Sequence, residues 1–352
     1  MTSPEQDGAS HGMKVSQLYV YPIKSLRGIK TSKAQLTKYG FPYDRSFMLL
    51  HDKGDKVEER YKNMFLADHP EMALFSTNIK FPDHNFKGEI TVTYTPPDDE
   101  ARTLTVPLQP DTADLASMDI TMHDSPTTGY NMGDHYNSWF SNCFGYPVAF
   151  VYIGSNTRAV LFPEANGRQQ PPSSWLTNIT STVSSIIGRE MKSQEERIAF
   201  HDCASYLVVN QKSCDAVSAW LPEGENMDIV KFRPNIVLSS TPSAWDEDYW
   251  GEITVSTSEG NQVKISLLHN CIRCQTLNID YSTGKLGTGK TGEVLKMLQK
   301  DRRVDKGKKY GAVFGRYGFL QGEGGMVSIG DEVRVSKRNG ERTAFGRWLI
   351  HP

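Results

Sequence analysis

The sequence predicts a mixed, mainly β fold in two lobes, with a few flanking helices. Short apolar segments separated by turn residues recur about every ten residues through the first half of the chain, which is typical of an antiparallel barrel or sandwich. Clear helical periodicity is limited to short segments at 131–143, 213–220 and 289–299. A chain of 352 residues is longer than one typical domain, so we expect two lobes.

Composition and charge narrow the classes of function. The formal net charge is -2, which gives no global attraction to a nucleic-acid polymer or a membrane surface. No apolar run is long enough to span a bilayer, and residues 1–12, which we expect to be disordered, show neither a signal core nor an Arg-rich transit pattern. Five cysteines, an odd number, favour reduced thiols and a cytoplasmic protein.

The N-terminal lobe is expected at 13–162, as an antiparallel β-barrel. Its first strand begins at Met13 and breaks at Tyr21 and Pro22, because proline cannot continue a paired strand. A helix is expected at 131–143, ended by Gly145. The further strands of this lobe are expected at 34–36, 45–50, 73–75, 90–94, 104–106, 120–123 and 148–153.

Polar corners of this lobe carry candidate anion-binding residues. Lys24 and Ser25 directly follow the first strand, and such a corner can hold an anion through side chains and exposed backbone N–H groups. A solvated turn is the alternative. Arg45 stands just before an apolar strand and Arg60 follows it, and each is by default a partner in a surface salt bridge.

The second lobe is expected at 197–340, after a junction at 163–196 and before a tail at 341–352. The junction is rich in Pro, Ser and Thr, with a poor helix at 175–187, so we interpret it as a mobile loop. Strands of the second lobe are expected at 206–210, 236–239, 263–268, 276–281 and within 313–335, with helices at 213–220 and 289–299.

Two polar turns precede strands of this lobe. Asp202 and Cys203 lie in a short turn before the strand at 206–210. Arg233, Pro234 and Asn235 lead into the strand at 236–239. A buried strand that begins with Arg and Asn has to satisfy those groups, either with backbone carbonyls or with a ligand.

We place the chemistry at Cys271 and Cys274, on a predicted strand–turn–strand corner. A thioredoxin-like dithiol is disfavoured because no helix follows the first cysteine, and a zinc site would need His269 and a distant fourth ligand. A single thiolate could instead bind a soft metal in a cofactor, with Arg273 favouring deprotonation. Two buried residues that act only as small hydrophobes are the remaining alternative.

The motifs together resemble the MOSC family, and within it the mitochondrial amidoxime-reducing component and its bacterial relatives. The similarity runs from about 15 to 335, and the order of the motifs makes it specific. The resemblance implies an N-terminal β-barrel followed by a MOSC-type β-barrel. The motifs are Tyr21-Pro-Ile-Lys-Ser25, Asp44-Arg45, Phe232-Arg-Pro-Asn235, Glu247-Asp-Tyr-Trp250, Cys271-Ile-Arg-Cys274, Asp280 to Gly284 and Phe314-Gly-Arg-Tyr317.

The resemblance implies an enzyme that carries the molybdenum cofactor, Mo-molybdopterin. The thiolate ligand of molybdenum maps to Cys274. A phosphate favours charge-assisted, bidentate donors, and a pterin favours directed polar groups. The other positions that the resemblance assigns to the cofactor are Lys24, Ser25, Arg45, Arg60, Asp202, Cys203, Arg233, Pro234, Asn235 and Ile272.

The sequence departs from the family at two of these places. Asp202, Cys203 and Ala204 stand where family members usually carry a pair of hydroxyl residues, and Ile272 stands where a small polar residue is common. The membrane anchor of the animal members is not seen either, so we expect a cytoplasmic location and leave mitochondrial association open.

The implied activity is reduction of N-hydroxylated compounds, namely amidoximes, hydroxylamines and N-hydroxylated bases, to their N–H forms, as in detoxification. Electrons would come from a separate protein such as a cytochrome b5 with its flavin reductase. One alternative is a cofactor carrier or a sulfur-transfer MOSC protein, although no pyridoxal-phosphate domain is expected here. A zinc-stabilised interaction domain is the other alternative.

Overall fold

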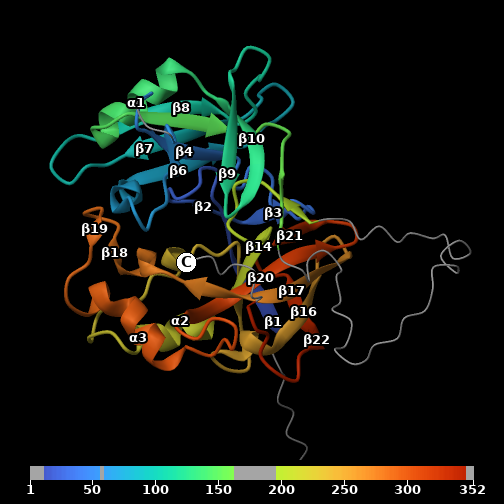
Figure 1. Cartoon of the computed structure of the whole chain (residues 1–352). Coiled ribbons are helices and arrows are strands. Elements are labelled where there is room, and N and C mark those ends of the chain that lie inside the picture. Colours follow the sequence, from blue (N-terminus) through green and yellow to red (C-terminus); the bar gives the residue numbers. More distant parts are fainter. Residues whose placement is uncertain (1–11, 56–58, 162–195, 346–352) are drawn as a thin grey trace, which may run out of the picture.

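The computed structural model describes residues 12–55, 59–161 and 196–345, and it is mainly β, as predicted (Figure 1). Almost all of the expected disordered N-terminus and of the expected junction, with its poor helix, lies outside the described residues, as does most of the tail. The predicted lobe boundaries stay a prediction. Among the described residues, no helix has the length and apolar character needed to cross a membrane.

A closed seven-stranded barrel forms the centre of the second half (Figure 1). Its strands follow one another in the order β15-β14-β20-β17-β16-β22-β1, and it closes because β1 also pairs with β15. Closure leaves no long free edge to aggregate. The strands are β1 (Met13–Val20), β14 (Tyr206–Asn210), β15 (Ile236–Ser239), β16 (Trp250–Ser256), β17 (Gln262–Arg273), β20 (Ala312–Gln321) and β22 (Glu332–Arg338).

The first strand of the chain therefore belongs to the barrel of the second half. Leu18 of β1 is fully buried and pairs with Ile236 of β15, more than 200 residues away. The other side of β1 pairs with β22 and with β2 (Ile29–Thr31). This closure carries the turn that follows β1, with Lys24 and Ser25, to the barrel wall.

The strands of the first half form two further sheets above the barrel in Figure 1. Their shared core is aromatic: Phe150 packs against Phe47 at 5.2 Å and Phe140 at 4.8 Å between ring centroids. The helix α1 (Asp134–Phe144) supplies Phe140. One sheet contains β4 (Phe47–Asp52), β5 (Tyr61–Asn63), β9 (Ser117–Met122), β10 (Ser125–Asn131) and β11 (Val148–Tyr152), and the other contains β6 (Phe75–Lys80), β7 (Glu89–Tyr94) and β8 (Arg102–Pro107).

Short helices and strand pairs complete the described fold. The predicted helices at 213–220 and 289–299 correspond to α2 and to η5 with α3. The helices are η1 (Pro70–Leu74), α2 (Gln211–Ser218), η2 (Ile229–Phe232), η3 (Asp246–Tyr249), η4 (Gln275–Asn278), η5 (Gly289–Glu293) and α3 (Val294–Asp301). The small strands are β3 (Lys33–Gln35), β12 (Arg158–Ala159), β13 (Arg197–Ile198), β18 (Ile279–Asp280), β19 (Lys285–Leu286) and β21 (Met326–Ser328).

The strand predicted downstream of the cysteine pair, at 276–281, is confirmed only at Ile279–Asp280, which form β18. Cys271 lies within β17, as expected, but the next residues form the short 3-10 helix η4, which begins after Cys274. Thr276 and Leu277 are both buried. A strand would send consecutive side chains to opposite faces, so two adjacent buried residues fit a helical turn better.

Three consecutive acids of η3 are buried beside the barrel: Asp246, Glu247 and Asp248. The outer two are paired, Asp246 with Arg338 and Asp248 with Arg302 at 2.6 Å. A buried carboxylate is costly unless it has such partners.

Glu247 has no basic partner of this kind among the described residues. Its Oε2 accepts hydrogen bonds from Asn210 Nδ2 and Ser213 Oγ, both at 2.9 Å, and these bonds join η3 to α2. Its Oε1 has no partner in the described part of the chain. Burial raises the pKa of Glu247 to about 7.

We expect Glu247→Gln to remove a pH dependence of stability. The pKa of this group is 4.5 in its ordinary state and about 7 in the folded protein, so folding takes up a proton. The stabilisation is complete below pH 4.5 and decreases by roughly 3 kcal/mol as the pH rises to about 7. Urea unfolding of both proteins across this range measures the difference.

The exposed Glu259 provides the matched control, since Glu259→Gln should follow the wild type at each pH. An equal pH dependence in the wild type and in Glu247→Gln would contradict the assignment.

Candidate functional site

A cavity of about 340 Å³ lies where the two halves of the chain meet. It brings together nine of the eleven residues that the sequence predicted as site residues. Two predicted residues, Pro234 and Arg60, do not line it. The nine that line it are Lys24, Ser25, Arg45, Asp202, Cys203, Arg233, Asn235, Ile272 and Cys274.

Arg60 lies at the surface instead. Its Nε and Nη2 donate to the two carboxylate oxygens of Asp52 at 2.9 and 2.8 Å, and Asp55 accepts a further bond. The side chain is 43 % exposed, so the two aspartates satisfy it in a surface salt bridge, which was the default expectation for an isolated arginine.

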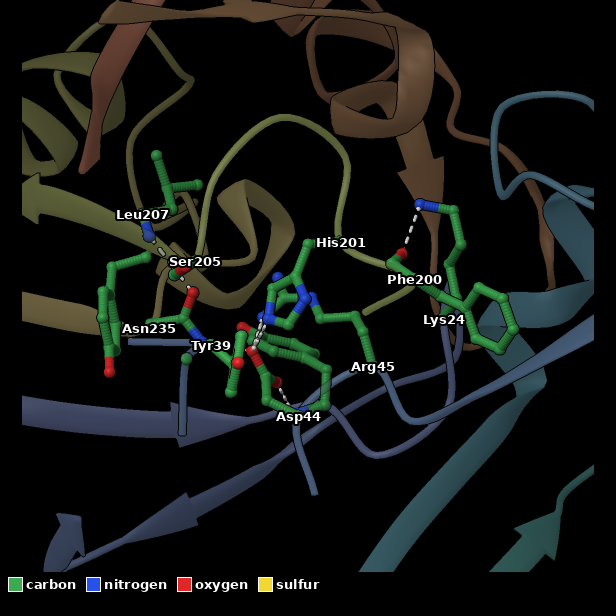
Figure 2. Close-up of polar contacts among 12 residues, drawn as sticks. Lys24, Tyr39, Asp44, Arg45, Phe200, His201, Ser205, Leu207 and Asn235 are labelled. Carbon is green, nitrogen blue, oxygen red and sulfur yellow. Dashed lines mark hydrogen bonds and ion pairs between the residues drawn. The ribbon is translucent and has the colours of Figure 1, made fainter. Parts of the chain in front are cut away.

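The Asp44 carboxylate is the centre of a buried hydrogen-bond network beside the cavity (Figure 2). It accepts bonds from the backbone N–H of Tyr21 at 2.7 Å and from Asn235 Nδ2 at 2.9 Å. His201 Nε2 lies 3.0 Å from Oδ2, and the Arg45 guanidinium completes the set. Burial alone would raise the pKa of Asp44, but Arg45, His201 and the Tyr21 N–H together lower it to about 2.

This network supplies hydrogen-bond partners to Asn235, the polar residue just before β15. Asn235 donates to Asp44 and to the Tyr19 carbonyl, and its Oδ1 accepts from the Leu207 N–H at 3.1 Å. Its amide is thus bonded within the protein, and it positions neighbouring groups. Arg233 differs, because the hydrogen bond of its guanidinium to the Leu26 carbonyl, at 2.7 Å, leaves donors unused.

Three residues of the cavity have left-handed backbone conformations. The φ angles of Ser25, Arg45 and Arg233 are 69°, 51° and 54°. This conformation is unfavourable for residues other than glycine, and each instance costs on the order of 1–3 kcal/mol. Backbone bonds hold the turns, such as Arg45 N–H to the Tyr21 carbonyl at 2.7 Å. The fold therefore maintains strain where the polar side chains converge.

The cavity contains four basic side chains, and two of them have no carboxylate partner among the described residues. Lys24 pairs with Asp202, and Arg45 pairs with Asp44. Arg233 and Arg273, by contrast, contact only carbonyls, aromatic rings and a thiol in the described chain. Partly buried guanidiniums with unused donors are suited to an anion such as a phosphate.

The ring of Tyr21 supports the arginines. The guanidinium carbons of Arg45 and Arg233 lie 4.5 and 4.4 Å from its centroid. A cation over an aromatic face is attracted by the ring quadrupole, so Tyr21 stabilises both charges without neutralising them. Gly28 is required here, because a Cβ at that position would lie 2.5 Å from the ring of Tyr21.

The two cysteines of the pair have different environments. Cys271 is buried, and its thiol accepts a bond from Arg273 Nη1 at 2.8 Å, while burial raises its pKa. Cys274 is exposed to the cavity, with Sγ 3.3 Å from Thr276 Oγ1. Among the described residues no group of three or more His, Cys, Asp and Glu is arranged to hold a metal, which leaves the zinc alternative without a ligand set.

Sequence reasoning missed several residues of the site. Asp44 was named only within the Asp44-Arg45 motif, and His201, which directly precedes Asp202, was given no role. Phe65 and His123 line the cavity from the first half, and Tyr317 lines it from β20. No local signal marks Phe65 or His123, because they reach the cavity through the packing of one half against the other.

Comparison with known proteins gives two family matches and a set of distant relatives. The family described as MOSC N-terminal beta barrel domain matches residues 12–147, and the MOSC domain family matches 195–334. Mitochondrial amidoxime-reducing component 1 of Mus musculus is 25% identical over 330 residues, covering 91% of this chain and 81% of that protein. The Homo sapiens protein of that name is 22% identical over 325 residues, covering 91% and 82%.

A second kind of relative is the molybdenum cofactor sulfurase. That of Oryza sativa subsp. japonica is 22% identical over 336 residues, which cover 92% of this chain but only 35% of the sulfurase. The chain therefore corresponds to about a third of that protein.

We expect Asp44→Asn to destabilise the protein by roughly 3–5 kcal/mol, because it leaves the buried Arg45 guanidinium without its counter-charge. Urea unfolding at neutral pH measures this loss. The matched control is Asp52→Asn, which removes the partner of Arg60 at the surface and should cost at most about 1 kcal/mol. Equal effects of the two substitutions would refute the central role of Asp44.

Proposed function

Because the chain belongs to the MOSC family, with a MOSC N-terminal beta barrel domain followed by a MOSC domain, we propose that it is a molybdenum-cofactor-dependent reductase of N-hydroxylated compounds. Its substrates would be amidoximes, hydroxylamines and N-hydroxylated bases, and its products the N–H forms. One observation carries the proposal: the exposed thiol of Cys274 shares a cavity with four basic side chains. The relatives named for amidoxime reduction support it.

The residues present fit Mo-molybdopterin in their donor chemistry. Cys274 would be the thiolate ligand of the metal, since it is the exposed thiol of the pair. The unused donors of Arg233 and Arg273 would bind the phosphate and the pterin, with Lys24, Ser25 and Arg45 around them. When bound, the cofactor supplies the redox chemistry that reduces the N–O bond.

The remaining residues would position these groups and limit access of water. Asp44 fixes Arg45, and Cys271 with the Phe232 carbonyl fixes Arg273, so the cationic wall is preorganised. Phe65 and Ile272 add apolar surface to the lining. A cavity of about 340 Å³ is at the lower end of the volumes common for small-molecule sites.

Electrons would come from a separate one-electron donor, such as a cytochrome b5 with its flavin reductase. We place the enzyme in the cytoplasm, in agreement with its unpaired cysteines.

The second candidate is a cofactor carrier or sulfur-transfer protein without reductase activity. The similarity to molybdenum cofactor sulfurases favours it, since their identities of 22% and 24% over more than 90% of this chain are close to the 25% and 22% of the amidoxime-reducing relatives. A chain that binds molybdenum but reduces no N-hydroxylated compound with any electron donor would support this candidate.

We expect protein produced in a host that makes the cofactor to contain nearly stoichiometric molybdenum and to reduce a simple amidoxime. Cys274→Ser should lower turnover to less than about a tenth, because it removes the soft ligand of the metal. Elemental mass spectrometry and a reductant-coupled assay measure the two quantities. Cys143→Ala is the control, since this cysteine lies outside the cavity. Zinc without molybdenum, or full turnover of Cys274→Ser, would refute the proposal.

We expect Arg233→Ala to lower cofactor affinity about tenfold or more, the usual effect of losing a charge-assisted hydrogen bond. Arg60→Ala should leave molybdenum content unchanged, because Arg60 pairs with Asp52 at the surface. Elemental analysis after dialysis against cofactor-free buffer compares the two variants. Equal molybdenum retention in both would count against the role of Arg233.

A further inference from the structure

His123 is the tip residue of the hairpin formed by β9 and β10. The strands pair up to Met122 and Ser125, so His123 and Asp124 make a two-residue turn, with φ angles of 51° and 60°. Such turns favour Asn and Gly, because both positions need positive φ. A histidine held here at a conformational cost points to a use for its side chain.

The ring of His123 lies against one wall of the cavity. It stacks on Phe65, with centroids 5.8 Å apart and planes at 21°, and its Nε2 lies 3.6 Å from Asp202 Oδ1. The ring is 39 % exposed, so it contacts both the cavity and solvent. Although burial works to raise it, the charges of Lys24 and His123 hold the pKa of Asp202 well below its usual range.

The proposed reduction consumes two protons, and several other proton-bearing side chains of the cavity are engaged elsewhere or hold their protons tightly. His201 is buried and bonded to Asp44, and Lys24 is paired with Asp202. Burial raises the pKa of Tyr317 and Cys203 well above their usual ranges, so neither releases a proton readily. Histidine is the usual general acid near neutral pH.

We propose that His123 is the catalytic general acid of this cavity, donating its Nε2 or Nδ1 proton to the substrate oxygen that departs as the N–O bond breaks. The inference rests on the proposed reductase function. The step balances because one N–OH group, two electrons and two protons give one N–H group and one water. The electrons come from the one-electron donor protein, one proton goes from His123 to the departing hydroxyl, and the other goes from solvent to nitrogen. His123 then regains a proton through its exposed edge.

The charged groups near His123 come from several segments. Asp202 faces the ring and pairs with Lys24, Asp124 is the adjacent residue, and Asp68 lines the same cavity. Arg158 donates to the Met122 and Asp202 carbonyls at 3.4 and 2.7 Å. Burial lowers the pKa of Arg158 only to about 10, and Lys24 holds Asp202 ionised, so these two keep their charges near neutral pH.

The test compares wild type, His123→Gln, His123→Ala and the control His84→Gln, an exposed histidine outside the cavity. Chemically reduced methyl viologen supplies electrons and benzamidoxime is the substrate, so no partner protein is needed. We expect kcat of His123→Gln to fall about a hundredfold, within the range for loss of a general acid, with KM changed less than about threefold. Molybdenum content should equal that of wild type.

Two further measurements distinguish a catalytic role of His123 from a structural one. The alkaline decrease of kcat in wild type and in His84→Gln should be absent from His123→Gln, and added imidazole should restore turnover to His123→Ala. Wild-type kcat and pH profile in His123→Gln would overturn the inference. A fall in kcat that matches a loss of molybdenum would also overturn it.

A last measurement needs no turnover. Diethyl pyrocarbonate modifies accessible imidazoles, and peptide mass spectrometry locates the product. In the oxidised, cofactor-loaded protein, benzamidoxime should slow modification of His123 and leave His84 unaffected. Equal rates of His123 modification with and without benzamidoxime would contradict contact between His123 and the substrate. If the proposed reductase function itself is wrong, the wild-type protein will lack molybdenum or show no turnover, and this result is distinct from those that contradict the role of His123.

Discussion

The buried Asp44 carboxylate is the interaction on which the site depends. Removing a carboxylate from water costs several kcal/mol unless donors surround it, so the fold has to bring donors to it. They come from segments that are distant in sequence: Tyr21 after β1, His201 before β14 and Asn235 before β15. One desolvated charge thereby ties the first half of the chain to the barrel and fixes Arg45 in its strained conformation. The same bonds keep the pKa of Asp44 low, so the network keeps its charge through the physiological range.

This constraint explains why the cavity can hold a surplus of positive charge. The charges of Arg233 and Arg45 repel each other, but carbonyls, a thiol and aromatic rings hold Arg233 and Arg273 in place. Such contacts satisfy individual donors without neutralising the charge. Keeping unneutralised guanidiniums in a partly buried wall lowers stability, and proteins accept that loss where an anion is to be bound.

The sequence was sufficient for the fold class and for most of the candidate site, because strand periodicity and short motifs are local signals. The strands at 206–210 and 236–239 have the predicted bounds, whereas η4 was missed because the alternation at 276–281 resembles a strand. The resemblance placed Arg60 in the cofactor site. In the structure its guanidinium pairs with Asp52 and Asp55, and no sequence pattern marks these pairs. The pairing of β1 with β15 and the convergence on Asp44 depend on contacts across much of the chain, which periodicity does not encode.

The cysteine pair illustrates the same limit at the scale of one motif. The spacing of Cys271 and Cys274 does not distinguish the two residues. It is compatible with a redox dithiol, a zinc site, a single metal ligand or two buried packing residues. The end of β17 separates them: the strand buries Cys271 under Arg273, and the chain then turns into η4, leaving Cys274 exposed to the cavity. A soft metal needs a thiolate that it can reach, and a thiol already bonded to a guanidinium in the core is a poor candidate. The proposal that Cys274 is the ligand is therefore supported by where the strand ends, which is a property of the fold.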